Sequence, residues 1–104
     1  MQITFKSPQM GNIMVRLFWS TYRTNNRTAL ELIDPRTGEP FTTATVNLPG
    51  VQLADDEIVL KDYSENEGML SSLIDAGVVQ DMGRRERTGF VTCPVVRVLR
   101  RDPA

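Results

Sequence analysis

A five-residue turn between two alternating segments constrains the fold of this chain most. Asp34-Pro35-Arg36-Thr37-Gly38 places proline where a type I turn favours it and glycine where the chain needs a positive φ. Leu30 and Leu32 alternate with their neighbours before the turn, and residues 41–48 alternate between apolar and polar residues after it. This pattern predicts a β-hairpin with a bulge, so the chain contains an antiparallel sheet.

Period-two alternation predicts further strands along the chain. The segments are 3–5, 13–19, 58–60 and 90–99. Pro94 lacks an N–H, which predicts that the last strand is a sheet edge or is bulged there. Residues 81–88 are polar throughout, and they are interpreted as a loop.

One helix is predicted, over residues 65–76. Ser64 is a favourable N-cap, and Glu67 completes a capping box with it. Gly77 stands where a left-handed helix end belongs. Gly68, within the first turns, indicates a close approach to the sheet or to a partner. The apolar stripe of this helix comprises Met69, Leu70, Leu73 and Ile74.

These elements predict an α+β fold: a twisted, mostly antiparallel sheet of five to six strands, with one helix (65–76) packed on one face. The chain of 104 residues has the length of a single domain, and residues 99–104 are expected to form a frayed tail. A single cysteine, no signal-peptide pattern and no long apolar run favour the cytoplasm.

The composition argues against catalysis. The chain has no histidine and one cysteine, which removes the usual general base and any cysteine-rich zinc site. Its glycines are dispersed and form no phosphate-binding loop. Residues 55–57, with Lys61 beyond them, faintly resemble a magnesium nuclease cluster, but neighbouring side chains on a strand point to opposite faces. Cys93 is interpreted as a core residue. We therefore expect a binding protein with no catalytic residue, metal or cofactor.

A net charge of −1 conceals two clusters of opposite sign. The acidic strip comprises Asp55, Asp56, Glu57, Asp62, Glu65 and Glu67, with Tyr63 as a candidate anchor. It is expected to bind a host protein by occupying a basic groove. The arginine group comprises Arg84, Arg85, Arg87, Arg97, Arg100 and Arg101. It supports an alternative, direct nucleic-acid binding, although the isoelectric point near 5.3 argues against that. A third interpretation is a dipolar surface whose arginines pair with local acids.

An open sheet edge also allows a partner strand to be added, or two copies to pair as a homodimer. Aromatic side chains are typical anchors of such interfaces. Besides Tyr63, the candidates are Phe18, Trp19, Tyr22 and Phe90.

The segment KDYSENEGML at residues 61–70, with Gly77 after it, resembles a family of small uncharacterised bacterial proteins. Weaker matches at 25–30, 38–40, 45–49 and 89–91 extend the resemblance over most of residues 22–92. The resemblance implies a plasmid, phage or integrative-element origin and implies no activity. Small proteins of mobile elements include anti-CRISPR and anti-restriction inhibitors. The leading expectation is therefore a monomeric or strand-paired inhibitor of a nucleic-acid-processing host defence complex. The alternative is a nucleic-acid-binding accessory protein.

Overall fold

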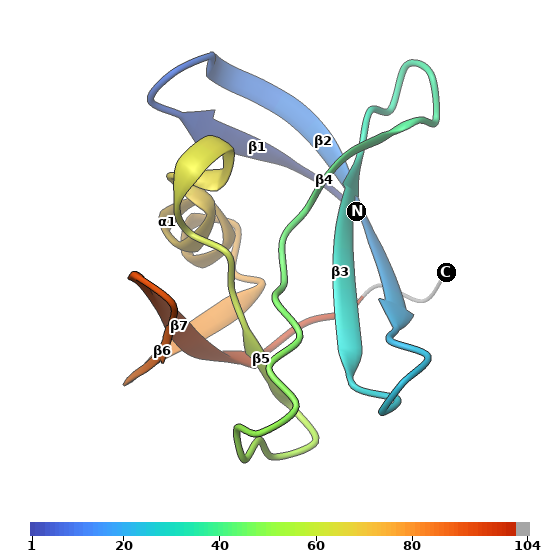
Figure 1. Cartoon of the computed structure of the whole chain (residues 1–104). Coiled ribbons are helices and arrows are strands. Elements are labelled where there is room, and N and C mark those ends of the chain that lie inside the picture. Colours follow the sequence, from blue (N-terminus) through green and yellow to red (C-terminus); the bar gives the residue numbers. More distant parts are fainter. Residues whose placement is uncertain (102–104) are drawn as a thin grey trace.

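The computed structural model describes residues 1–101 as an α+β fold with two antiparallel sheets (Figure 1). The first sheet has the order β1-β2-β3-β4 and the second has the order β5-β7-β6. One 3₁₀ turn, η1, and one short helix, α1, lie between β5 and β6 in the chain. The elements are β1 (Gln2–Ser7), β2 (Gly11–Thr21), β3 (Thr28–Ile33), β4 (Pro40–Thr43), β5 (Glu57–Val59), η1 (Ser64–Asn66), α1 (Met69–Asp75), β6 (Val79–Thr88) and β7 (Val91–Val98).

The α+β class is confirmed, but the prediction of a single sheet of five to six strands is wrong. The strand predicted over residues 41–48 ends early, because the chain there leaves the first sheet for the second. The Ala44 N–H still donates to the Leu30 carbonyl of β3 at 2.8 Å. The Val46 N–H already donates to the Val59 carbonyl of β5 at 3.0 Å. This crossing segment joins the two sheets around one core.

The β3–β4 hairpin follows the predicted turn. Gly38 has a φ of +77°, and its N–H donates to the Asp34 carbonyl at 2.8 Å. The pairing of β3 with β4 shifts register between Leu32 and Ile33, which is the predicted bulge.

The predicted loop at 81–88 is wrong, because these residues belong to β6. Among the described strands it pairs with β7 alone, so it is a sheet edge in which polar side chains can face water on both sides. A register shift between Asp81 and Arg84 accommodates Gly83, whose φ is +74°. The sequence of β6 therefore lacks a period-two apolar alternation, although the segment forms a strand.

The prediction that β7 is an edge or is bulged at Pro94 is also wrong. β7 is the middle strand of its sheet, and the irregularity of the hairpin lies in β6. The Pro94 carbonyl accepts from the Leu60 N–H at 2.9 Å, so the proline nitrogen faces the same side. On that side the pairing of β7 with β5 ends at Val95, so no strand pairing requires an N–H donor from Pro94.

The predicted helix exists with different bounds and a different cap. The chain from Ser64 to Asn66 is a 3₁₀ turn, and α1 begins only at Met69. Ser64 has a φ of +57° and makes no capping bond, so the capping box is absent. Asp62 Oδ1 accepts from the Leu70 N–H at 3.0 Å instead. No helix within residues 1–101 is long and apolar enough to cross a membrane.

The C-terminal end of α1 matches the prediction. Gly77 has a φ of +73°, its N–H donates to the Ile74 carbonyl, and the Val78 N–H donates to the Leu73 carbonyl. These bonds satisfy carbonyl groups that the last helical turn leaves free.

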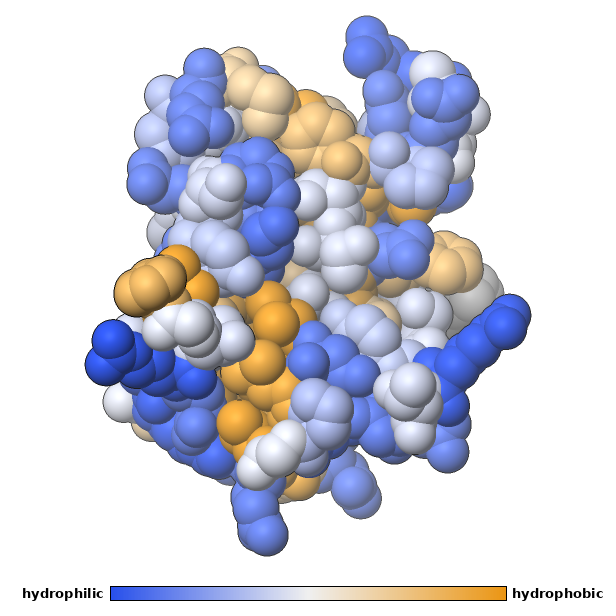
Figure 2. Space-filling model, viewed as in Figure 1, coloured by the Kyte–Doolittle hydropathy of each residue, from blue (hydrophilic) through white to orange (hydrophobic). Residues whose placement is uncertain are grey.

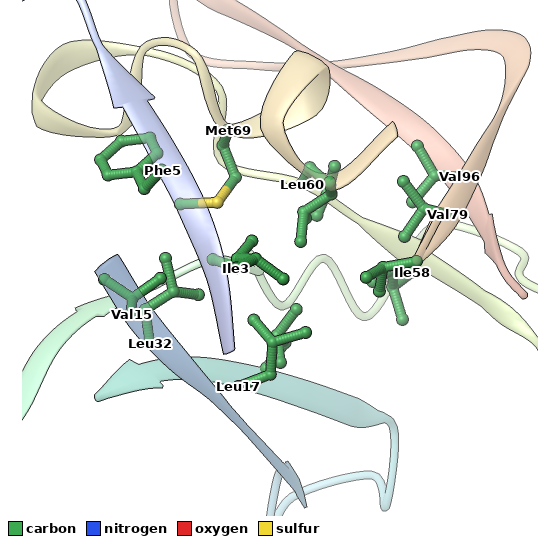
Figure 3. Close-up of a cluster of buried hydrophobic side chains, with 14 residues drawn as sticks. Ile3, Phe5, Val15, Leu17, Leu32, Ile58, Leu60, Met69, Val79 and Val96 are labelled. Atoms are coloured by element: carbon green, nitrogen blue, oxygen red, sulfur yellow. The ribbon is translucent and has the colours of Figure 1, made fainter. Parts of the chain in front are cut away.

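The core lies between the two sheets, with α1 closing the gap between β1 and β6 (Figures 1 and 3). Met69 and Leu73 are fully buried on the inner face of α1. Ile74 is 41% exposed, so the buried stripe is narrower than predicted. Figure 3 shows Met69 and Leu60 among side chains from both sheets, such as Phe5 and Val96.

Part of the predicted tail is bonded to the body of the protein. The Leu99 N–H donates to the Val78 carbonyl at 2.8 Å. Arg101 Nη2 donates to Thr28 Oγ1 at 2.7 Å. The remainder of the predicted tail, 102–104, lies outside the described residues.

Candidate functional site

The acidic strip divides into two groups at opposite ends of the molecule. The loop that carries Asp55 and Asp56 lies at one end, and η1 with Glu65 lies toward the other (Figure 1). The extended segment through β5 separates them. Glu57 is half-buried, and its Oε1 accepts from the Ala54 N–H at 2.7 Å. The carboxylates therefore do not share one continuous surface.

The group near η1 has mainly local bonds. Asp62 caps α1 as described above, and Lys61 Nζ donates to Glu65 Oε1 at 2.5 Å. That bond is the main cause that lowers the pKa of Glu65 from 4.5 to about 2. Tyr63 is half-buried beside a small apolar cluster, with Lys61 Nζ 5.5 Å from its ring centre. Glu67 is exposed; its N–H donates to the Ser64 carbonyl at 3.1 Å, and its carboxylate has no partner within residues 1–101.

The arginine group is also largely occupied by local partners. Arg85 binds both carboxylate oxygens of Asp81 at 2.9 Å, which holds the pKa of Asp81 below its usual value. Arg84 donates to Glu86 at 2.9 Å and to the Gln52 carbonyl at 2.8 Å. Arg84 and Arg85 thus bond to neighbouring groups on and beside β6 and are not free charges.

The two clusters meet on and beside the second sheet, β5-β7-β6. Arg97 Nε is 3.2 Å from Asp56 Oδ2, and Arg84 Nη1 is 3.9 Å from Glu57 Oε1. The structure thus places two carboxylates of the acidic strip against two arginines of the arginine group. This arrangement corresponds to the dipolar surface that the charge pattern also allowed.

The remaining arginines of the group behave differently from one another. Arg101 lies over the Trp19 ring, with Cζ 5.3 Å from its centre. Arg87 donates to the Gly89 carbonyl at 3.4 Å. Arg100 is exposed and has no partner within residues 1–101.

Cys93 and the acidic side chains are the remaining candidates for reactive groups among the described residues. Cys93 is fully buried, and desolvation raises the pKa of its thiol, with a smaller effect from the charge of Asp62. Residues 1–101 hold no group of three or more histidine, cysteine, aspartate or glutamate side chains placed to bind a metal.

A hollow of the surface lies between two hairpin tips, and sequence reasoning missed it. It encloses about 580 Å³ and is bounded by the first half of β2 and by the turn between β3 and β4. Figure 2 shows apolar atoms at its base between two polar tips. We call it the hairpin groove; its lining residues are Asn12, Ile13, Met14, Val15, Asp34, Pro35, Arg36 and Phe41.

The groove exists because β3 is shorter than β2. The last pair between these strands is Arg16 with Ile33, and the chain then turns away. If β3 continued in register, Pro35 would stand opposite Met14, where it has no N–H to donate. The first half of β2 therefore pairs with β1 on one side and with no described strand on the other.

Apolar side chains remain exposed around this part of β2. Met14 is 52% exposed and Met10 is 51% exposed, and Phe18 is 50% exposed on the same outer face as Met14. The sequence did contain a signal, since Met14 and Phe18 interrupt the alternation of β2 with apolar residues on its polar face. Phe90, at the tip of the β6–β7 hairpin, is fully exposed.

No protein-family model, curated protein or solved structure matches this chain significantly.

Proposed function

We propose that this chain is a non-catalytic binding protein whose partner is another protein. The observation that carries the proposal is the hairpin groove, an apolar hollow with exposed methionines at its border. Methionine is flexible and polarizable, and it is common on surfaces that adapt to a protein partner. Concave sites with few polar groups are typical binding sites.

The charged surfaces also favour a protein over a nucleic acid as the partner. Arg84, Arg85 and Arg97 each face a carboxylate, so phosphate groups would have to compete with bonds that already exist. Counterion release, the main source of nucleic-acid affinity, needs cations that the protein has not neutralised itself. This favours a protein partner over the nucleic-acid alternative.

Within this class, we propose stoichiometric inhibition of a nucleic-acid-processing host complex. The support is the resemblance of residues 61–70 to a family of mobile-element proteins, together with a surface that suits occupation rather than turnover. The acidic strip is not needed for this proposal, because most of its carboxylates have local partners.

An affinity capture from a nuclease-treated lysate of the natural host tests the proposal. We expect a protein to be retained in one-to-one ratio with the wild-type chain. Met14→Glu, which places a charge at the groove, should abolish retention. The matched variant Phe90→Glu, an exposed apolar residue elsewhere, should retain the partner. Proteins that are captured from an untreated lysate but lost after nuclease treatment would instead support the nucleic-acid alternative.

A further inference from the structure

The geometry points to an extended peptide segment of another protein as the occupant of the hairpin groove. We propose that this segment pairs with the open edge of β2 through the main-chain groups of Asn12 and Met14. The inference rests on the proposed function, because it specifies how a protein partner is held.

The main-chain groups on this edge can be assigned from the register. The Leu17 N–H donates to the Met1 carbonyl at 2.9 Å, so odd-numbered residues of β2 face β1. Even-numbered residues face the other side, where Arg16 is the last to find a partner in β3. Asn12 and Met14 therefore direct N–H and carbonyl groups into the groove. No described residue hydrogen-bonds to these groups.

Unpaired main-chain donors and acceptors in alternation are complementary to another extended chain. A residue of the added strand opposite Ile13 or Val15 would point toward the core side of the sheet. There it would meet Phe41, which is half-buried and whose ring packs edge-on against Phe5 at 6.1 Å. The segment should therefore carry apolar residues at alternate positions.

The shape and charge of the groove select among strand-like occupants. The groove has a hairpin on each side, so it admits a single extended chain more readily than a strand already paired in a folded sheet. The charged side chains that line it are Arg36, with 87% of its side chain exposed, and Asp34, which is bonded to Arg36 and 28% exposed. A neutral or acidic segment of a partner fits this balance, whereas a basic one does not.

The test is a selection of displayed random nonapeptides on the full chain, counter-selected on Met14→Pro. Proline at this position removes the Met14 N–H, one of the two that face the groove, and leaves the pairing with β1 intact, since Met14 and Thr4 form a non-bonded pair. Met14→Val keeps the N–H and removes the original side chain, so it is the matched control. Circular dichroism and thermal unfolding establish that both variants are folded.

We expect enriched peptides that alternate apolar and polar residues and avoid lysine and arginine. Their affinity should fall at least about tenfold in Met14→Pro and little in Met14→Val, because a main-chain bond is lost only in the first. Methylation of the peptide main-chain nitrogen that pairs with β2 should weaken binding similarly.

Three results would overturn the inference: no enrichment over Met14→Pro, equal binding by both variants, or self-association that Met14→Pro abolishes. The last would make a second copy the occupant. The peptide selection does not use the natural partner, so a failed capture from the lysate would not contradict the inference about the edge of β2. Conversely, a host protein captured equally by wild type and Met14→Pro would preserve the proposed function and reject this edge.

Discussion

The Lys6 carbonyl oxygen lies so close to Gly68 that a Cβ built on this glycine would stand 2.2 Å from it. Two further bonds join the same stretch of β1 to α1. The Lys6 N–H donates to Ser72 Oγ at 2.8 Å, and Lys6 Nζ donates to Asp75 at 2.6 Å. α1 therefore covers the outer edge of β1 at Lys6, in contrast to the open edge of β2.

Gly68→Ala should destabilise the fold by more than a positive φ alone explains. A left-handed conformation costs a residue with a side chain about 1–2 kcal/mol. Gly68 has a φ of +98°, so Gly68→Ala carries this cost. The substitution would also push β1 away from α1, because the atom that clashes with the new Cβ belongs to the main chain of Lys6. Urea denaturation measures the free energy of unfolding. Gly38→Ala is the matched control, with a φ of +77° and no atom within 4 Å of the added Cβ. Equal losses in the two variants would contradict the close contact.

Local signals in the sequence were sufficient for the α+β class, for the β3–β4 hairpin and for the presence of one short helix. The turn at 34–38 and the alternation of β2 and β3 predicted antiparallel pairing, because turn geometry and period-two patterns act over few residues. The glycine at position 68 was correctly associated with a close approach to the sheet, and Gly77 with the helix end. Each of these depends on main-chain geometry that few residue types allow.

Long-range features escaped prediction for physical reasons. β6 has polar residues on both faces because it is an edge strand, and no periodicity reveals such a strand. The exit of residues 44–46 from the first sheet depends on β5, which comes later in the chain. The hairpin groove depends on the difference in length between β2 and β3, so the candidate site could not be predicted even though Pro35 and Met14 were visible.

Substitution of Asn66 should show how η1 is fixed to β4. Asn66 is fully buried; its Nδ2 donates to the Thr43 carbonyl at 2.8 Å, and its Oδ1 accepts from Thr42 Oγ1 at 2.7 Å. Asn66→Ala leaves the carbonyl group without a partner, which should cost about 1–3 kcal/mol of unfolding free energy.

Asn66→Asp tests the same bonds through pH. Burial favours the protonated form, which can still donate to the Thr43 carbonyl, whereas the ionised form cannot. Its destabilisation should therefore grow as pH rises from 4 to 7, as measured by denaturation at each pH. A loss that does not change with pH would contradict the arrangement at η1.

Glu65 should titrate well below an ordinary glutamate. The bond from Lys61 is the largest cause that lowers its pKa to about 2 from 4.5. Because the pKa of Glu65 is lower in the folded state than in the unfolded chain, the ion pair stabilises the fold at pH values above the unfolded pKa. This contribution disappears as the pH falls toward 2. Carboxyl ¹³C chemical shifts followed against pH measure the midpoint. Lys61→Met should raise it toward 4.5; a midpoint near 4.5 in the wild-type chain would show that the ion pair does not form in solution.

The protein should not retard duplex DNA in a mobility assay, even at low salt of about 50 mM, where phosphate contacts are strongest. The reason is the pairing of Arg85 with Asp81 and of Arg97 with Asp56. A shift that disappears in the double variant Arg84→Glu, Arg85→Glu would show that the arginine group binds nucleic acid despite these bonds.

Amide hydrogen exchange should alternate along the first half of β2 in the free protein. The Ile13 and Val15 N–H groups face β1 and pair with it, so they should exchange slowly. The Asn12 and Met14 N–H groups face the groove and should exchange fast, whereas Phe18, which pairs with β3, provides a protected even-numbered control. Two-dimensional NMR after transfer to D₂O resolves each amide. Slow exchange at Met14 in a monomeric sample would mean that this edge is already covered, and the groove would then have no free main-chain groups to offer a partner.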